Sequence, residues 1–301
     1  MRSLATLQRH GRTVGGILVA VGAVVACVGV WSSGRPASQF SFVPGGVVLL
    51  GLGLVVAAAC GATLWWSLLA LVGPRRPWST VARAWCGGTP AKYLPGKVGS
   101  VVARAALLGE PHALHAATAT AEVLLTLAVG GLVALAIPLE RTGTSTVAAA
   151  VVIGALSVVL VWFARRRLVT TSSELDVMPF VVAVAALAGG WVAQGMALGG
   201  AIVAVGGPLS SADMTVWCGI AGAAAIAGVL SPMPAGLGPR DALLGVLVVE
   251  LLHEDVGRAA FAVFVWRLAS VTVELALAAG AALASRWLAR RAAPRGDEVQ
   301  R

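Results

Sequence analysis

The stretch SPMPAGLGPRD, residues Ser231 to Asp241, decides the fold because it separates two long apolar runs. Proline lacks an amide hydrogen and glycine adds backbone freedom, so a helix cannot continue through three prolines and two glycines. At membrane depth, a broken backbone is tolerated only where protein or a watery cavity satisfies its polar groups. We therefore expect a cavity here, with Arg240 and Asp241 entering the next helix beside it.

Composition predicts a membrane protein built entirely of helices. Hydrophobic residues make up 58% of the 301 residues, charged residues make up 12%, and the mean hydropathy is +0.89. We expect an all-α polytopic fold of about 7 or 8 transmembrane helices, because apolar runs of this length suit a bilayer better than a soluble core. Residues 1–288 form one transmembrane domain in this interpretation, and 289–301 form a basic and polar cytoplasmic tail.

The positive charges indicate orientation rather than nucleic-acid binding, although the net charge is +9. Most of the 22 Lys and Arg fall in four clusters, which alternate with loops that carry few of them. Positively charged loops stay in the cytoplasm, so both termini are expected there, in a multi-pass protein of the bacterial plasma membrane. The clusters are residues 2–12, 75–104, 165–167 and 286–301.

The apolar runs predict the individual spans. A GxxxG motif, Gly195 with Gly199, favours close helix packing, and Trp65 with Trp66 suits an interfacial belt. Pro138 is expected to begin an outside turn. The expected spans are 14–31, 43–72, 112–137, 146–163, 179–205, 214–230 and 259–287, with a short helix over 242–252.

A second broken stretch, KYLPGKVGSVVARAALLGE, carries too many charges for an ordinary span. It breaks at Pro95 and Gly96, and Gly99 with Ser100 is expected to cap a short helix over 101–108. That helix is too short for a hydrocarbon core about 30 Å thick, so we interpret it as a re-entrant half-helix.

The two broken stretches resemble one another. LPGKVGSVVARAALLG and MPAGLGPRDALLGVLV both place Pro, Gly, a second Gly and then a charge before a short apolar helix. Paired interrupted segments of this kind indicate a transporter site at the bilayer midplane. We therefore expect two re-entrant helical hairpins that gate a path, with gate residues Pro95, Gly96, Gly99, Pro234, Gly236 and Gly238.

Charged residues inside apolar segments suggest the chemistry. A charge facing lipid costs about 2.5 to 3.5 kcal/mol, so these groups should face inward. Guanidinium groups bind phosphate oxygens bidentately, which predicts a headgroup-phosphate site. An alternative is that the charges are structural ion pairs, above all Glu250 and Glu274. The expected phosphate ligands are Lys97, Arg104, Arg240 and Arg267, with Glu122, Asp241 and Glu274 as counter-charges or proton-coupling groups.

The sequence offers little for an enzyme. It contains no HExxH, GxSxG or P-loop motif, so we expect no catalytic residue, metal or cofactor. His112 and His115 are expected to be solvated at a loop–helix junction. The cysteines have no CxxC spacing, which favours buried thiols.

These segments resemble a known family. YLPGKVGSVVARAALL, TATAEVLLTL, MPAGLGPRDALL and Arg267 are similar to the transmembrane region of lysylphosphatidylglycerol synthases, also called the flippase-like domain family. The resemblance implies movement of aminoacylated phospholipids or lipid-linked sugars between leaflets. The family pattern is nearer GLGxxE, where this chain has Asp241, and a basic residue often follows the glutamate, where this chain has Val123. The synthases of this family also carry a cytosolic aminoacyl-transfer domain. This sequence shows no such domain, so we expect no synthesis of lysyl-lipid by this chain.

Together these features predict a flippase-like transporter of an anionic phospholipid or lipid-linked headgroup. The alternatives left open are a membrane scaffold for a lipid-modifying or glycosyltransferase enzyme and, ranked lower, an intramembrane enzyme. The expected partners are membrane phospholipids or a lipid-linked substrate, and no nucleic acid. Homo-oligomers and an enzyme partner stay open.

Overall fold

The structure is a computed structural model that describes residues 42–93, 98–141, 177–208, 214–231, 233–236 and 238–292. The expected spans 14–31 and 146–163 lie outside the described residues, as do Pro95, Gly96 and Lys97 and most of the expected tail.

Every regular element in the described part of the chain is a helix, which confirms the all-α prediction. Four helical segments there are long and apolar enough to cross a membrane, and they indicate a membrane protein. In chain order the elements are α2 (Pro44–Val72), α3 (Trp78–Gly88), η2 (Thr89–Tyr93), α4 (Gly99–Leu108), α5 (His112–Arg141), α7 (Val177–Ala204), α8 (Met214–Leu230), η4 (Pro234–Gly236), α9 (Pro239–Leu252) and α10 (Val256–Ala292).

Three local expectations are wrong. Helix α5 continues past Pro138 to Arg141, although the proline removes one hydrogen bond to the preceding turn. Ser100 does not cap α4. Val98 occupies the N-cap position, and no side chain makes a capping hydrogen bond there. Helix α9 begins at Pro239 rather than residue 242, because proline at the first helical position needs no amide hydrogen.

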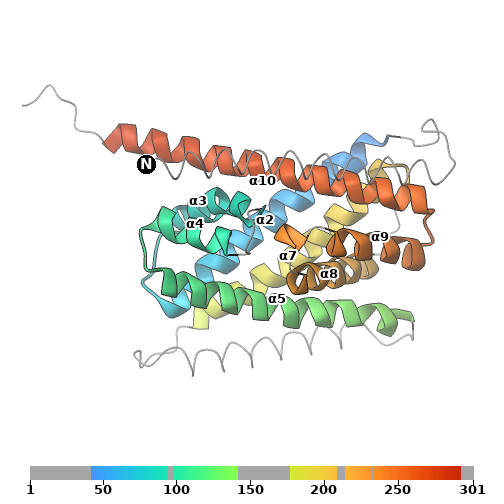
Figure 1. The fold of residues 1–301 in the computed structure, drawn as a ribbon, viewed down its shortest axis with the longest axis horizontal. Helices are drawn as coiled ribbons and strands as arrows, with labels where there is room; N and C mark the ends of the chain where they lie inside the picture. The colour runs from blue at the N-terminus through green and yellow to red at the C-terminus, as the bar shows by residue number, and fades with distance from the viewer. Residues whose placement is uncertain are drawn as a thin grey trace, which may run out of the picture.

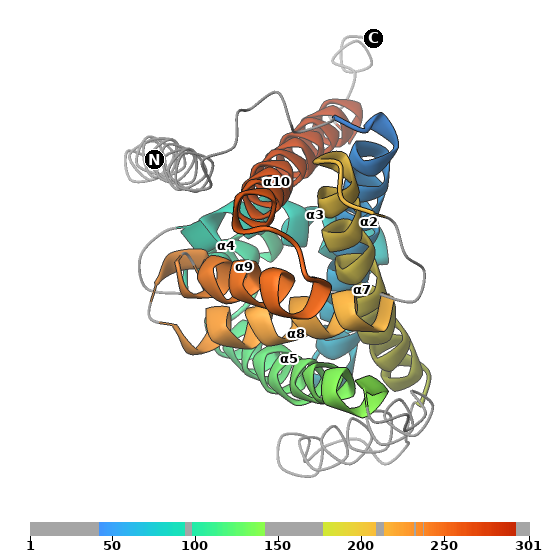
Figure 2. The same ribbon diagram turned by 90° about the vertical axis from the view of Figure 1, so that its right-hand side faces the viewer.

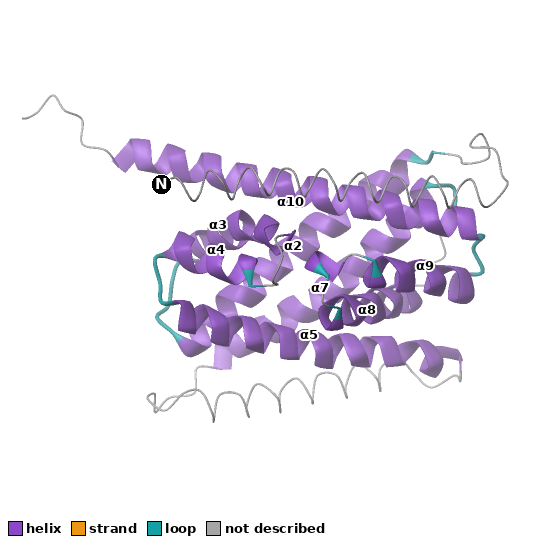
Figure 3. Cartoon of the chain, viewed as in Figure 1, coloured by secondary structure: helices purple, strands orange, loops and turns teal. Residues whose placement is uncertain are grey.

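The helices form a bundle with one helix pair near each end. Helices α5 and α10 run along opposite sides of the molecule, and α2 and α7 cross between them (Figure 1). The α3–α4 pair lies toward the left of that view and the α8–α9 pair toward the right, where Figure 2 shows α8 and α9 side by side. Their turns η2 and η4 contact each other, and the fully described connections, 73–77, 109–111 and 253–255, are short (Figure 3).

The broadest helix contact joins α2 to α7, and it depends on glycine. A Cβ at Gly53 would lie 2.7 Å from the backbone nitrogen of Ala197, and one at Gly200 would lie 2.4 Å from that of Leu50. Because no side chain intervenes, the two backbones touch. The GxxxG residues Gly195 and Gly199 face a different helix, α8, where they contact Cys218 and Trp217.

A buried apolar cluster fixes α8, α9 and α10 against this α2–α7 pair. Its members come from all five helices and exclude water from one side of the bundle. They include Leu50, Leu198, Ile220, Leu244 and Trp266.

We predict that Gly53→Ala destabilises the fold by about 1–3 kcal/mol, because the added methyl group overpacks two backbones. The matched control is Gly51→Ala on the same helix, where a Cβ meets nothing within 4 Å. The melting midpoints in detergent should fall for Gly53→Ala and stay level or rise for Gly51→Ala. Equal midpoints would contradict this packing.

Candidate functional site

The interruption predicted between two apolar runs lies between α8 and α9. Helix α8 ends at Leu230, and the Oγ of Ser231 accepts a hydrogen bond from the amide of Met233 at 3.1 Å. Gly236 has a φ of 69°, and a Cβ there would lie 2.6 Å from the Cα of Gly228. Glycine at both positions lets the turn fold back onto α8. The turn thereby places Arg240, in the first turn of α9, beside the interior of the bundle.

Helix α10 holds α9 through an ion pair. The guanidinium of Arg267 donates from Nε to Oδ1 of Asp241 at 3.1 Å, and its Nη2 donates to the same oxygen. Asp241 also lies in the first turn of α9, where the helix dipole favours a negative charge.

The same helix holds the α3–α4 pair two turns further on. Glu274 accepts hydrogen bonds from Nζ of Lys92 at 2.5 Å and from the hydroxyl of Tyr93 at 3.0 Å. Lys92 and Tyr93 belong to η2, so the turn between α3 and α4 is fastened to α10.

Arg104 of α4 is enclosed by aromatic rings. Its side chain is buried, with the guanidinium carbon 4.4 Å from the Trp65 ring centre and 5.2 Å from that of Trp85. Among the described residues its acidic partner is Glu122 of α5, whose Oε2 lies 3.4 Å from Nη1 of Arg104. Gly88 makes room for it, since a Cβ there would lie 2.7 Å from the Cγ of Arg104.

Arg240 differs from the other cations of the site. Its guanidinium carbon lies 4.6 Å from the Trp266 ring centre, and its buried Nε has no hydrogen-bond partner. Among the described residues, no carboxylate forms a salt bridge with it, whereas Lys92, Arg104 and Arg267 each have one. A half-buried cation whose Nε is out of contact with water and has no acidic partner is costly, so this position is suited to an anion from outside the chain.

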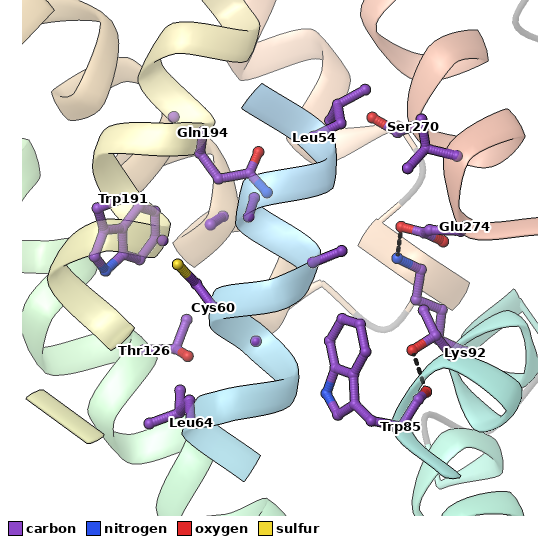
Figure 4. Close-up of a pocket in the computed structure, with 18 of the residues that line it drawn as sticks. Leu54, Cys60, Leu64, Trp85, Lys92, Thr126, Trp191, Gln194, Ser270 and Glu274 are labelled. Carbon is purple, nitrogen blue, oxygen red and sulfur yellow. Dashed lines mark hydrogen bonds and ion pairs between the residues drawn. The ribbon is translucent and has the colours of Figure 1, made fainter. Parts of the chain in front are cut away.

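These groups surround a cavity of about 350 Å³, within the range of about 300–1,000 Å³ usual for small-ligand sites. Small residues of α2, namely Ala57, Ala58 and Gly61, leave room along one wall. Figure 4 shows Lys92 and Glu274 on one side of α2, and Trp191, Gln194, Cys60 and Thr126 on the other. The charged lining residues are Lys92, Arg104, Glu122, Arg240, Arg267 and Glu274.

The cavity and its ion pairs contain an excess of positive charge. Four cations, Lys92 and the three arginines, meet only three carboxylates, those of Glu122, Asp241 and Glu274. Arg240 is the unpaired member, so within the described part of the chain one positive charge remains uncompensated at the α8–α9 turn.

Most of the residues predicted from sequence come together here. Arg104, Glu122, Arg240, Arg267 and Glu274 line one cavity, and Asp241 is bonded to Arg267. Gly99 begins α4, while Gly236 and Gly238 lie in the second turn, each with a positive φ. Pro234 belongs to η4, and Lys97, Pro95 and Gly96 lie outside the described residues. Glu250 is exposed on α9 and takes no part in the cavity.

Sequence reasoning missed several site residues. Lys92 and Tyr93 precede the Pro95 break, and a charge beside such a break was an available signal. Trp65 was expected in an interfacial belt, but it is fully buried, and its ring stacks on His115 and lies against the Arg104 guanidinium. The solvated role expected for His115 is wrong as well. Its side chain is buried, and its Nε2 lies 3.1 Å from Oε2 of Glu110.

The described residues contain no group of three His, Cys, Asp or Glu side chains placed to hold a metal ion. No protein-family model matches the chain, and no curated protein matches it.

We predict that Glu274→Gln lowers the melting midpoint, because it leaves the Lys92 ammonium without its carboxylate. The pair is half-buried, so the loss should fall below the cost of about 3–5 kcal/mol for breaking a fully buried pair. Adding Lys92→Met should restore much of the loss, since the orphaned charge is then gone. Glu250→Gln, at an exposed carboxylate, is the control and should change little. Additive losses in the double variant would show that the pair does not fasten η2 to α10.

Proposed function

We propose that this chain translocates an anionic phospholipid or lipid-linked headgroup between the leaflets of a bacterial plasma membrane, while the acyl tails stay in the bilayer. The observation that carries the proposal is Arg240, a cation at a cavity wall with a buried Nε and no acidic partner among the described residues. A phosphate group would supply the missing negative charge and accept the free N–H.

The helix lengths support a re-entrant arrangement for both helix pairs. Helix α4 has 10 residues and α9 has 14. At 1.5 Å per residue they reach about 15 and 21 Å, short of a hydrocarbon core about 30 Å thick. Their turns contact each other, so each pair would enter the bilayer and turn back at a shared depth. With α8 in a re-entrant pair, six of the expected spans cross the bilayer, and the two pairs bring the membrane-inserted units to eight. An even number of crossings keeps both termini on the cytoplasmic side.

The mechanism follows from the positions of the charges. A headgroup entering the cavity meets Arg240 at the start of α9, where the helix dipole adds partial positive charge. Arg104 and Arg267 line the same cavity and offer further donors. Their carboxylate partners, Glu122 and Asp241, neutralise them when the phosphate leaves. The turn within each helix pair, η2 in one and η4 in the other, would then open in alternation. Such movement of a lipid between leaflets is what the resemblance to the flippase-like family implies.

We predict that Arg240→Gln lowers the rate of headgroup exchange in proteoliposomes by about tenfold or more, the effect of losing one charged hydrogen bond. The assay follows a labelled anionic phospholipid by its accessibility to a membrane-impermeant quencher. Arg286→Gln is the matched control, because Arg286 is exposed near the end of α10 and outside the cavity.

Exchange that survives neutralisation of Arg104, Arg240 and Arg267 together would remove the phosphate site. If the intact protein exchanges no anionic lipid but retains a lipid-modifying or glycosyltransferase enzyme on purification, the scaffold alternative holds instead.

A further inference from the structure

A row of contacting side chains leads from an exposed loop to Arg104, and the mechanism above makes no use of it. Nε of Arg76, in the connection before α3, donates to Oε1 of Glu110 at 2.9 Å, and Oε2 of Glu110 lies 3.1 Å from Nε2 of His115. The imidazole of His115 stacks on the ring of Trp65, with 5.9 Å between the ring centres. Trp65 in turn lies against the Arg104 guanidinium. The row therefore joins the exposed Arg76 to a cation of the cavity.

Arg104 is held loosely by its own carboxylate, so it is sensitive to other charges nearby. The 3.4 Å between its Nη1 and Oε2 of Glu122 is longer than the separation of about 2.7–2.9 Å in a strong charged hydrogen bond. Its buried Nε has no hydrogen-bond partner, and the rings of Trp65 and Trp85 enclose the guanidinium. Charges interact more strongly where water is excluded. A change of charge at His115 therefore acts on Arg104.

The two ring nitrogens of His115 have different surroundings. Because an ionised carboxylate only accepts hydrogen bonds, Nε2 carries the hydrogen in the contact with Glu110. Nδ1 of the neutral ring is then an acceptor, and it is buried without a hydrogen-bond partner. Protonation adds an N–H at Nδ1 and a positive charge to a side chain that is fully buried. Histidine ordinarily changes charge between about pH 5 and 8, so this is a change that a cell can produce.

The groups around His115 leave the added charge only partly balanced. Among the described residues, Glu110 is the carboxylate in contact with the ring, and Arg76 already shares it. Arg104 of α4 is a cation, His112 of α5 becomes one at low pH, and α2 presents the neutral ring of Trp65. Protonation of His115 therefore changes the sum of charges on Arg76, Glu110 and His115 from zero to one positive charge.

We propose that His115 is a positioning residue through which pH sets how tightly Arg104 holds an anion in the cavity, an inference that rests on the function proposed above. Protonation of His115 raises the positive potential at Arg104, so the cavity binds an anion more tightly. Loss of the proton lowers that potential and favours release. Arg76 belongs to the basic cluster 75–104, which we expect on the cytoplasmic side, so the pH that acts on His115 is that of the cytoplasm.

The test is calorimetric titration of the purified protein with short-chain phosphatidylglycerol, a probe whose single negative charge does not change across this pH range. The affinity of the natural chain should rise by about threefold or more from about pH 8 to about pH 5.5. His115→Gln stays neutral and keeps a donor for Glu110, so it should lose most of that rise, and His115→Asn is a second neutral variant. His112→Gln, at an exposed position of the same helix, is the matched control and should keep the rise. Melting midpoints at both pH values establish that each variant is folded.

Binding by the natural chain that is equal at the two pH values would overturn the role of His115 and leave the proposed function standing. The same conclusion follows if a folded His115 variant binds more weakly at both pH values but keeps the full rise, because His115 would then act only through packing. If the natural chain binds phosphatidylglycerol at neither pH, and exchanges no anionic lipid in proteoliposomes, the proposed function fails and this inference fails with it.

Discussion

Charged groups inside an apolar bundle must be paired, and that constraint organises this structure. Arg267 and Glu274 of α10 stand seven residues apart, about 10 Å along the helix axis. The first binds Asp241 of α9 and the second binds Lys92 and Tyr93 of η2. One helix therefore fixes the positions of both helix pairs, and the contact between their turns follows from this arrangement. Loss of either ion pair would leave a charge in a poorly solvated place.

Arg240 is the exception to the pairing, and the function that we propose follows from it. Its neighbour Asp241 is bonded to Arg267, and the aromatic face of Trp266 is a much weaker partner than a carboxylate. Neutralising Arg240 with another acidic residue would stabilise the empty protein and close the site to anions. On the function that we propose, the fold tolerates this cation because the cavity beside it admits an anionic ligand.

Much of the architecture could be predicted from the sequence, because proline, glycine and charge are conspicuous in apolar segments. They located the α8–α9 turn and, except for Lys92, the charged residues that line the cavity. The pairing of Lys92 with Glu274 could not be predicted, since it joins residues 182 apart and depends on how α3 and α10 cross. The position of Trp65 was predicted wrongly for a related reason, because an indole suits a membrane interface and a buried cation–π contact equally well. Nor could the sequence show that Gln194 lines the cavity with its Oε1 unpaired.

The measurement that tests this account most directly is an experimental structure of the protein in nanodiscs that contain an anionic phospholipid. The account predicts density for a phosphate group within hydrogen-bonding distance of the Arg240 guanidinium, inside the cavity and beside the turn that joins α8 to α9. An Arg240 side chain paired with a carboxylate of the protein, with lipid phosphates confined to the outer surface of the bundle, would contradict it.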